Sequence, residues 1–74
     1  MMEKLIEDLQ IGDTLVFLND AGKPQETAVV TKKQLTHAIK YDSGCAAYDL
    51  EYRFLGGHRE TVFAAARDIA TVQA

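Results

Sequence analysis

The side chains best suited to chemistry in this chain are its histidines and its cysteine, and they are few. There are two histidines, His37 and His58, and one cysteine, Cys45. Imidazole and thiolate groups serve as metal ligands, bases and nucleophiles, but a metal site needs three or four converging ligands. Neither histidine stands in such a pattern, and His58 falls in a Gly-Gly-His-Arg turn, where a solvated role is usual. We expect no metal site and no catalytic histidine.

The surroundings of Cys45 do not favour a reactive thiol. A single cysteine excludes an internal disulfide, and the stretch YDSGCAAY holds no cation that would lower the thiol pKa. A small, partly buried residue is the simpler interpretation. No Ser-His-Asp or Cys-His pattern is visible, and Gly56-Gly57 lacks the lysine and further glycines of a phosphate loop. The sequence therefore predicts a protein that is not an enzyme and has no cofactor.

Positive charge is concentrated in one segment. The net charge is −3, yet residues 27–41 contain no Asp or Glu. A strip of cations that could contact phosphates comprises Lys32, Lys33, His37, Lys40 and Arg53. Phosphate contacts dominate nucleic-acid affinity, and the acidic balance of the whole chain disfavours them. Lysines on edge strands also block pairing with foreign strands. Nucleic-acid binding is thus the alternative function, and it predicts affinity that falls steeply with salt.

Aromatic side chains offer a third kind of site. Four of them could surround a cationic group: Tyr41, Tyr48, Tyr52 and Phe54. The last three share one face of a strand, however, and so small a domain needs such side chains to fill its inside. The row is therefore predicted to be mainly core, with Tyr41 and Tyr48 keeping an exposed edge for a partner.

The elements that position these residues must fit into one small domain. The chain has 74 residues, of which 47% are hydrophobic and 26% charged, as in folded globular domains. No apolar run approaches the roughly 18 residues of a membrane helix. The N-terminus is charged throughout, unlike a secretion signal, so we expect a cytoplasmic protein that does not bind membranes.

Residues 1–10 are predicted to form a short amphipathic helix. Leu5, Ile6 and Leu9 recur at helical spacing among charged residues. A helix of two turns is marginal in water, so its apolar stripe must lie on the domain or on another subunit. These three residues are therefore candidates, with Tyr41 and Tyr48, for binding a partner.

Residues 11–74 read as one domain of short strands. Alternating or β-branched residues and turn signals indicate strands near Leu15–Leu18, at Thr27–Lys32, at Tyr48–Phe54, at Arg59–Ala65 and near the C-terminus. Gly56-Gly57 indicates a tight hairpin turn, and Ala66 to Ile69 a break of one turn.

Residues 33–42 allow two interpretations. Continued alternation through Leu35, His37 and Ile39 extends the preceding strand. Alternatively, Thr31 and Gln34 form a capping box, and a helix runs near residues 32–42, which makes the fold α+β. We favour the strand and a mainly β fold.

The order of these elements resembles small SH3-like β-barrels. The resemblance rests on Ile11 to Leu15, on Tyr48 to Gly57 and on Val62 to Val72, where a strand ends in small residues before a single turn and a last strand. It implies a five-stranded barrel behind the N-terminal helix. Type II dihydrofolate reductases are similar in length and strand order, but their Val-Gln-Ile-Tyr motif is replaced by Glu60-Thr61-Val62-Phe63. Reductase activity is therefore not implied.

Function at this point is a prediction of class only, because a fold does not specify one activity. The leading hypothesis is a small non-catalytic binding module that docks a protein partner or its own copy, since a small core benefits from a partner. Nucleic-acid binding through the lysine-bearing arm is the alternative. Small-molecule binding at an oligomer interface is a third hypothesis.

Overall fold

The described part of the protein is mainly β-strand and has almost no helix. A computed structural model describes residues 1–36 and 46–73. The described strands are β1 (Met2–Leu5), β2 (Thr14–Leu18), β3 (Pro24–Thr36), β4 (Ala47–Phe54), β5 (Arg59–Ala65) and β6 (Ile69–Val72). One 3-10 turn, η1 (Ile6–Asp8), follows β1. The mainly β fold class predicted from the sequence is confirmed.

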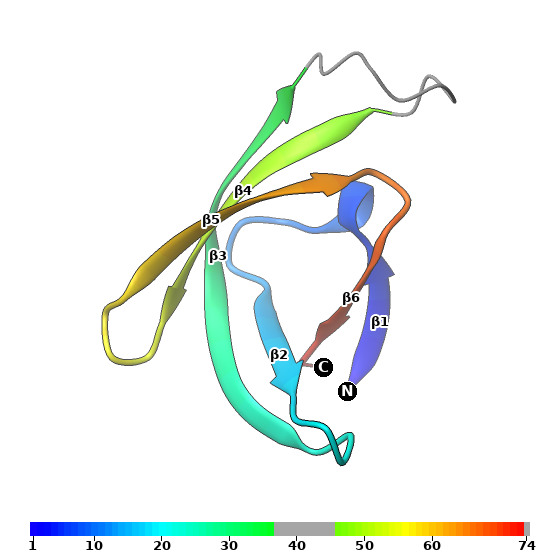
Figure 1. Cartoon of the computed structure of the whole chain (residues 1–74). Helices are drawn as coiled ribbons and strands as arrows, with labels where there is room; N and C mark the ends of the chain where they lie inside the picture. The colour runs from blue at the N-terminus through cyan, green and yellow to red at the C-terminus, as the bar shows by residue number, and fades with distance from the viewer. Residues whose placement is uncertain (37–45, 74) are drawn as a thin grey trace.

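The six strands form one antiparallel sheet in the order β1-β6-β2-β3-β4-β5. The sheet bends so strongly that β6 and β1 lie across from β5 (Figure 1). The last described strand, β6, lies between β1 and β2, which places Val72 near the C-terminus opposite Met2 near the N-terminus. Backbone N–H groups of η1 reach the segment after β5, with Ile6 donating to Asp68 (2.8 Å) and Glu7 to Ala66 (3.0 Å).

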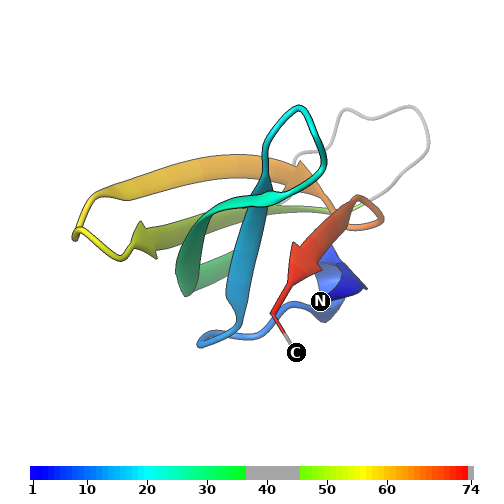
Figure 2. The same ribbon diagram turned by 90° about the horizontal axis from the view of Figure 1, so that it is seen from below.

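The long strand β3 connects the two halves of the sheet. Its first residues pair with β2, and its residues from Ala28 onward pair with β4. The β3–β4 register shifts between Val30 and Lys32, and such a bulge bends a strand and increases its twist. As a result, β2 and β6 run crosswise to β4 and β5 (Figure 2).

The hydrophobic core lies between these two halves. Alternate residues of β4 face inward, and Leu50 and Tyr52 are buried while Tyr48 and Phe54 are half-buried against the same cluster. The other buried members of the cluster are Ile6, Leu9, Leu15, Ala28, Val30 and Val72. The prediction that the aromatic row of β4 is mainly core is therefore confirmed.

The hairpin between β4 and β5 forms where Gly56-Gly57 predicted it. Phe54 donates its N–H to the carbonyl of His58 and accepts from Gly57, each at 2.8 Å. Gly57 has a φ of 94°, a conformation that a residue with a Cβ rarely adopts. The return strand β5 spans the predicted residues, Arg59–Ala65.

The N-terminal helix predicted for residues 1–10 is wrong. Residues 2–5 form β1, which pairs with β6, and only Ile6–Asp8 form a single 3-10 turn. The edge of β6 gives Met2–Leu5 interstrand hydrogen bonds, whereas two helical turns would have been marginal alone. The sheet consequently has a sixth strand beyond the five that were predicted.

The choice between strand and helix after Thr31 is answered in part. Residues 32–36 belong to β3 and pair with β4, from Lys32 opposite Glu51 to Thr36 opposite Ala47. The helical alternative is therefore wrong for these residues. Its remaining part, residues 37–42, lies outside the described residues.

Candidate binding surface

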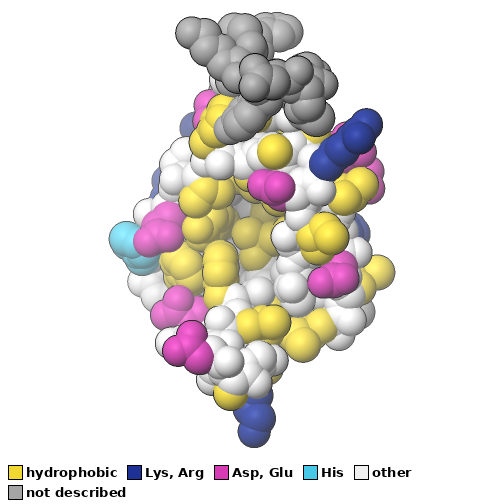
Figure 3. All heavy atoms as spheres, turned by 45° about the vertical axis from the view of Figure 1, so that its right-hand side comes forward, with side chains coloured by type: hydrophobic (Ala, Val, Ile, Leu, Met, Phe, Trp, Pro, Cys, Tyr) yellow, Lys and Arg dark blue, Asp and Glu magenta, His cyan; other side chains and the backbone are white. Residues whose placement is uncertain are grey.

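An open apolar recess enters the molecule between β2, β5 and β6. Its volume is about 470 Å³. The innermost lining comes from core residues such as Leu15, Leu50 and Tyr52, and the outer lining includes Leu18, Val62 and Ile69. Hydrophobic side chains gather in the hollow on this face of the molecule (Figure 3). Both the volume and the apolar lining are typical of sites that receive a ligand or an inserted side chain.

The sheet topology explains why this recess stays open. Strands β2 and β6 have a single pair of opposed residues, Leu15 and Val72. Strand β5 is at one end of the sheet order and pairs only with β4 among the described strands. Three apolar side chains remain exposed around the opening, namely Leu18 (43%), Val62 (37%) and Ile69 (63%). We call these three the recess rim.

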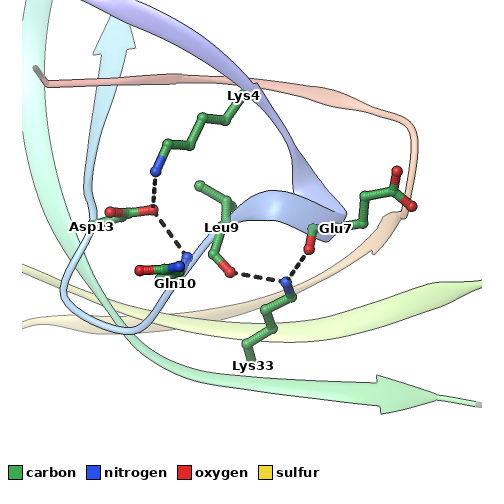
Figure 4. A network of polar contacts seen from close by, with 6 residues as sticks. All are labelled: Lys4, Glu7, Leu9, Gln10, Asp13 and Lys33. Atoms are coloured by element: carbon green, nitrogen blue, oxygen red, sulfur yellow. Dashed lines mark hydrogen bonds and ion pairs between the residues drawn. The ribbon is translucent and has the colours of Figure 1, made fainter.

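A polar network holds the segment between η1 and β2 in place (Figure 4). The Asp13 carboxylate accepts a hydrogen bond from the backbone N–H of Gln10 (2.9 Å) and pairs with Lys4 Nζ at 3.1 Å. The backbone hydrogen bond, followed by the Lys4 contact, lowers the pKa of Asp13 below its ordinary value. The ion pair links β1 to the residue before β2, and the Gln10 hydrogen bond together with Lys4 favours the charged form of Asp13.

Lys33 fastens the same segment from the other side (Figure 4). Its Nζ donates to the carbonyl oxygens of Glu7 at 2.6 Å and Leu9 at 2.8 Å. The same nitrogen lies 4.6 Å from the centroid of the Tyr48 ring, within range of a cation–π interaction. The ammonium group thus serves as a structural contact between β3, β4, the η1 turn and the residue that follows it.

A smaller polar cluster flanks Tyr52. The Tyr52 hydroxyl donates to Glu60 Oε2 at 3.3 Å, and His58 Nε2 lies 3.3 Å from Glu60 Oε1. Burial, and then the nearby Glu60 carboxylate, raise the pKa of Tyr52. Deprotonation of this buried phenol is therefore disfavoured, and its ring contributes to the wall of the recess in the neutral form.

The candidates for partner binding occupy different environments. Ile6 (6% exposed) and Leu9 (2%) are in the core, and Leu5 is half-buried beside η1. Tyr48 is half-buried beneath Lys33. Tyr41 and Cys45 lie outside the described residues. Ile6 and Leu9 of the predicted N-terminal stripe are buried against the sheet of the same chain, so they need no partner subunit to cover them.

The candidates for phosphate binding are divided in the same way. Lys32 and Arg53 are exposed, whereas Lys33 is half-buried and bonded to two carbonyl groups. His37 and Lys40 lie outside the described residues. Consecutive residues of a strand face opposite sides, so Lys32 and Lys33 do not form one cationic surface.

The sequence reasoning did not single out the recess rim. One available signal was that β2 is apolar on both faces, with Leu15 and Phe17 alternating with Val16 and Leu18. This pattern indicates that both faces contact apolar surroundings, but it does not tell which other strands form the recess. The contribution of Ile69 depends on how β6 diverges from β2, which no local pattern encodes.

No group of three or more His, Cys, Asp or Glu residues within 1–36 and 46–73 is arranged to hold a metal ion. In the same part of the chain, no helix has the length and apolar character to cross a membrane. Comparison of the chain with protein-family models, with curated proteins and with solved structures found no match in any of the three.

Proposed function

We propose that this protein is a small binding module with no chemistry of its own, which docks a protein partner or a second copy of itself through the apolar recess. The observation that carries the proposal is the recess rim, where Leu18, Val62 and Ile69 remain exposed around a hollow of about 470 Å³. Contiguous exposed apolar surface around a hollow is typical of protein interaction sites.

An SH3-like barrel is the architecture that we propose for residues 11–74. Strands β2 to β5 are neighbours in sequence order, and β6 returns beside β2 after the single turn at Arg67 and Asp68. This order supports the resemblance drawn from the sequence. Strand β1 would then be an addition that pairs with β6.

A second copy is the occupant we would test first. The surface contains both a hollow and protruding apolar side chains, of which Ile69 is 63% exposed. In a two-fold arrangement the same patch meets itself, so a rim residue of each copy can enter the recess of the other. Because a domain of this size has a small core, an interface with a second copy can contribute a useful share of its stability.

The test compares Ile69→Glu with Ile11→Glu. Ile11 is equally exposed (67%) but does not line the recess, so it is a matched control. We expect sedimentation equilibrium to show a mass that rises with concentration for wild type and Ile11→Glu, and not for Ile69→Glu. A wild-type protein that stays monomeric would contradict self-association. If Ile11→Glu also became monomeric, the interface would lie elsewhere.

Nucleic-acid binding receives less support. Lys33 is bonded to two backbone carbonyls, which leaves Lys32 and Arg53 as the exposed described members of the strip. Few phosphate contacts would give a shallow dependence of affinity on salt. A titration with single- and double-stranded DNA and RNA at two salt concentrations would favour this alternative if binding were tight at low salt and steeply salt-dependent.

A further inference from the structure

A pair of arginines faces outward at the end of the molecule that carries the β4–β5 hairpin. Arg53 of β4 lies directly opposite Arg59 of β5. Along an antiparallel ladder, hydrogen-bonded pairs of residues alternate with non-hydrogen-bonded pairs. In this ladder the backbone N–H of Phe54 donates to His58 and that of Ala66 donates to Ala46, so the pairs next to these are not hydrogen-bonded. Arg53 and Arg59 therefore form a non-hydrogen-bonded pair, in which the side chains are closest, with Cβ atoms roughly 4.5–5.5 Å apart.

The charges near this arginine pair do not neutralise it. Within the described residues, no ion pair involves either arginine. The nearest acidic residue on the same face of β4 is Glu51, which lies opposite Lys32 and accepts a hydrogen bond from Thr31 at 3.0 Å. Like charges placed directly opposite one another are destabilising. This face therefore favours the approach of an anion.

A shallow apolar hollow adjoins the arginine pair. It has a volume of about 100 Å³, and Arg53 lines it together with Val29 and Leu55. Val29 lies opposite Arg53 on β3 and is 39% exposed, and Leu55 at the hairpin is 97% exposed. A cationic pair thus lies beside apolar surface that water covers in the free protein.

We infer that the Arg53–Arg59 pair and its hollow bind a carboxylate of a peptide segment, with an adjacent apolar side chain of that segment covering Val29 and Leu55. Arginine guanidinium groups match carboxylates in shape as well as charge. On this face Lys32 lies opposite Glu51, which leaves the two arginines as the cations with no acidic residue opposite them, in a chain of net charge −3. Two cations suit one carboxylate better than the row of phosphates of a nucleic acid. This second site is separate from the recess.

The test uses the full chain and short synthetic peptides followed by amide NMR. The probe is acetyl-TLELT-amide, and its uncharged twin is acetyl-TLQLT-amide. A third peptide, acetyl-TTLL with a free C-terminus, and its amide distinguish a side-chain carboxylate from a terminal one. We expect the carboxylate peptides to shift the amides of Val29, Arg53, Leu55 and Arg59, and to bind about tenfold more tightly than their uncharged twins.

The protein variants Arg53→Gln and Arg59→Gln should each weaken binding of the carboxylate peptides by about tenfold. Arg67→Gln is the control, because Arg67 is exposed in the turn after β5 and away from the hollow. Equal binding of charged and uncharged peptides, or an equal loss in Arg67→Gln, would overturn the inference. The inference would also be overturned if an RNA oligonucleotide shifted the same amides and bound with higher affinity than the peptides. Ile69→Glu should leave peptide binding unchanged, which separates this site from the recess.

Discussion

Lys33 places its ammonium nitrogen 4.6 Å from the centre of the Tyr48 ring. The two residues are diagonal neighbours, since Lys33 pairs with Leu50 on β4 and Tyr48 with Leu35 on β3. The same nitrogen donates to the carbonyls of Glu7 in η1 and of Leu9 just after it, so one side chain joins the central strands to this turn. A lysine that appeared in the sequence as a candidate phosphate contact is thus part of the structural framework.

Replacing Lys33 with methionine should destabilise the protein. The variant loses two charge-assisted hydrogen bonds and a cation–π contact, so we expect the free energy of unfolding to fall by about 1–3 kcal/mol. Lys32→Met is the control, because Lys32 is exposed, and its effect should stay within about 0.5 kcal/mol. Urea denaturation measures both variants. Equal effects of the two substitutions would contradict the structural role of Lys33.

Truncating Leu9 should cost far more stability than truncating Ile11. Leu9 is 2% exposed within the core, whereas Ile11 is 67% exposed two residues later. Large-to-small changes at buried sites cost about 2–5 kcal/mol, so Leu9→Ala should lower the midpoint of thermal unfolding sharply. Ile11→Ala should have little effect. A Leu9→Ala protein with unchanged melting temperature would show that Leu9 is not packed in the core.

Asp13 should make the protein sensitive to acid. Its pKa is lowered in the folded state, chiefly by the Gln10 backbone N–H and then by Lys4. Such a carboxylate stabilises the fold above its unfolded-state pKa, and this stabilisation is lost as the pH falls through the folded-state pKa. Asp13→Asn should therefore be less stable than wild type at neutral pH, by about 0.5–1.5 kcal/mol, and should lose less stability on acidification. Asp20→Asn, at an exposed loop position, is the control for denaturation across the acidic range.

Tyr52 should make the stability of the protein sensitive to alkaline pH. Burial and Glu60 raise its pKa in the folded state, so the unfolded chain loses this proton first. The stabilisation is complete below the unfolded-state pKa and is lost as the pH rises through the folded-state value. Tyr52→Phe should remove this part of the alkaline loss of stability, and Glu60→Gln should reduce it. An alkaline unfolding profile identical in wild type and Tyr52→Phe would contradict the prediction.

The arginine pair should cost the free protein some stability. Removing one of two like charges that face each other across a ladder relieves roughly 0.2–1 kcal/mol. Arg53→Gln and Arg59→Gln should therefore raise the free energy of unfolding at low salt, and the gain should shrink at high salt because salt screens exposed charges. Arg67→Gln serves as the control in the same denaturation series. A loss of stability in both variants would contradict the proposed repulsion.

The sequence predicted those parts of the fold that depend on local pattern. Alternation in Tyr48 to Phe54 identified β4 and its inward face, and Gly56-Gly57 identified the hairpin that aligns β5 with it. In each case the periodicity of a strand, or the backbone freedom of glycine, acts on neighbouring residues alone. The bounds of β5 were predicted correctly for the same reason.

The errors came from features that depend on distant residues. Leu5, Ile6 and Leu9 have helical spacing, but pairing with β6, more than 60 residues later in the chain, makes Met2–Leu5 a strand. The candidate sites were affected in the same way. The role of Lys33 depends on backbone carbonyls of a turn far away in the sequence, and the recess depends on how β6 leaves β2. Neither relationship leaves a signal within one segment.

The position of β6 has a consequence for how the protein is made. Strand β2 can pair with β3 early, but β1 pairs only with β6 among the described strands, so the first strand synthesised cannot take its place in the sheet until residues 69–72 have left the ribosome. The β4–β5 hairpin is local and can form earlier, whereas pairing of β1 with β6 joins the ends of the chain, and such non-local contacts form slowly. During translation, the apolar residues of the N-terminal segment, including Ile6 and Leu9, therefore stay exposed until the strands that cover them have been synthesised. A nascent chain halted before Ile69 should therefore be a ready substrate for chaperones.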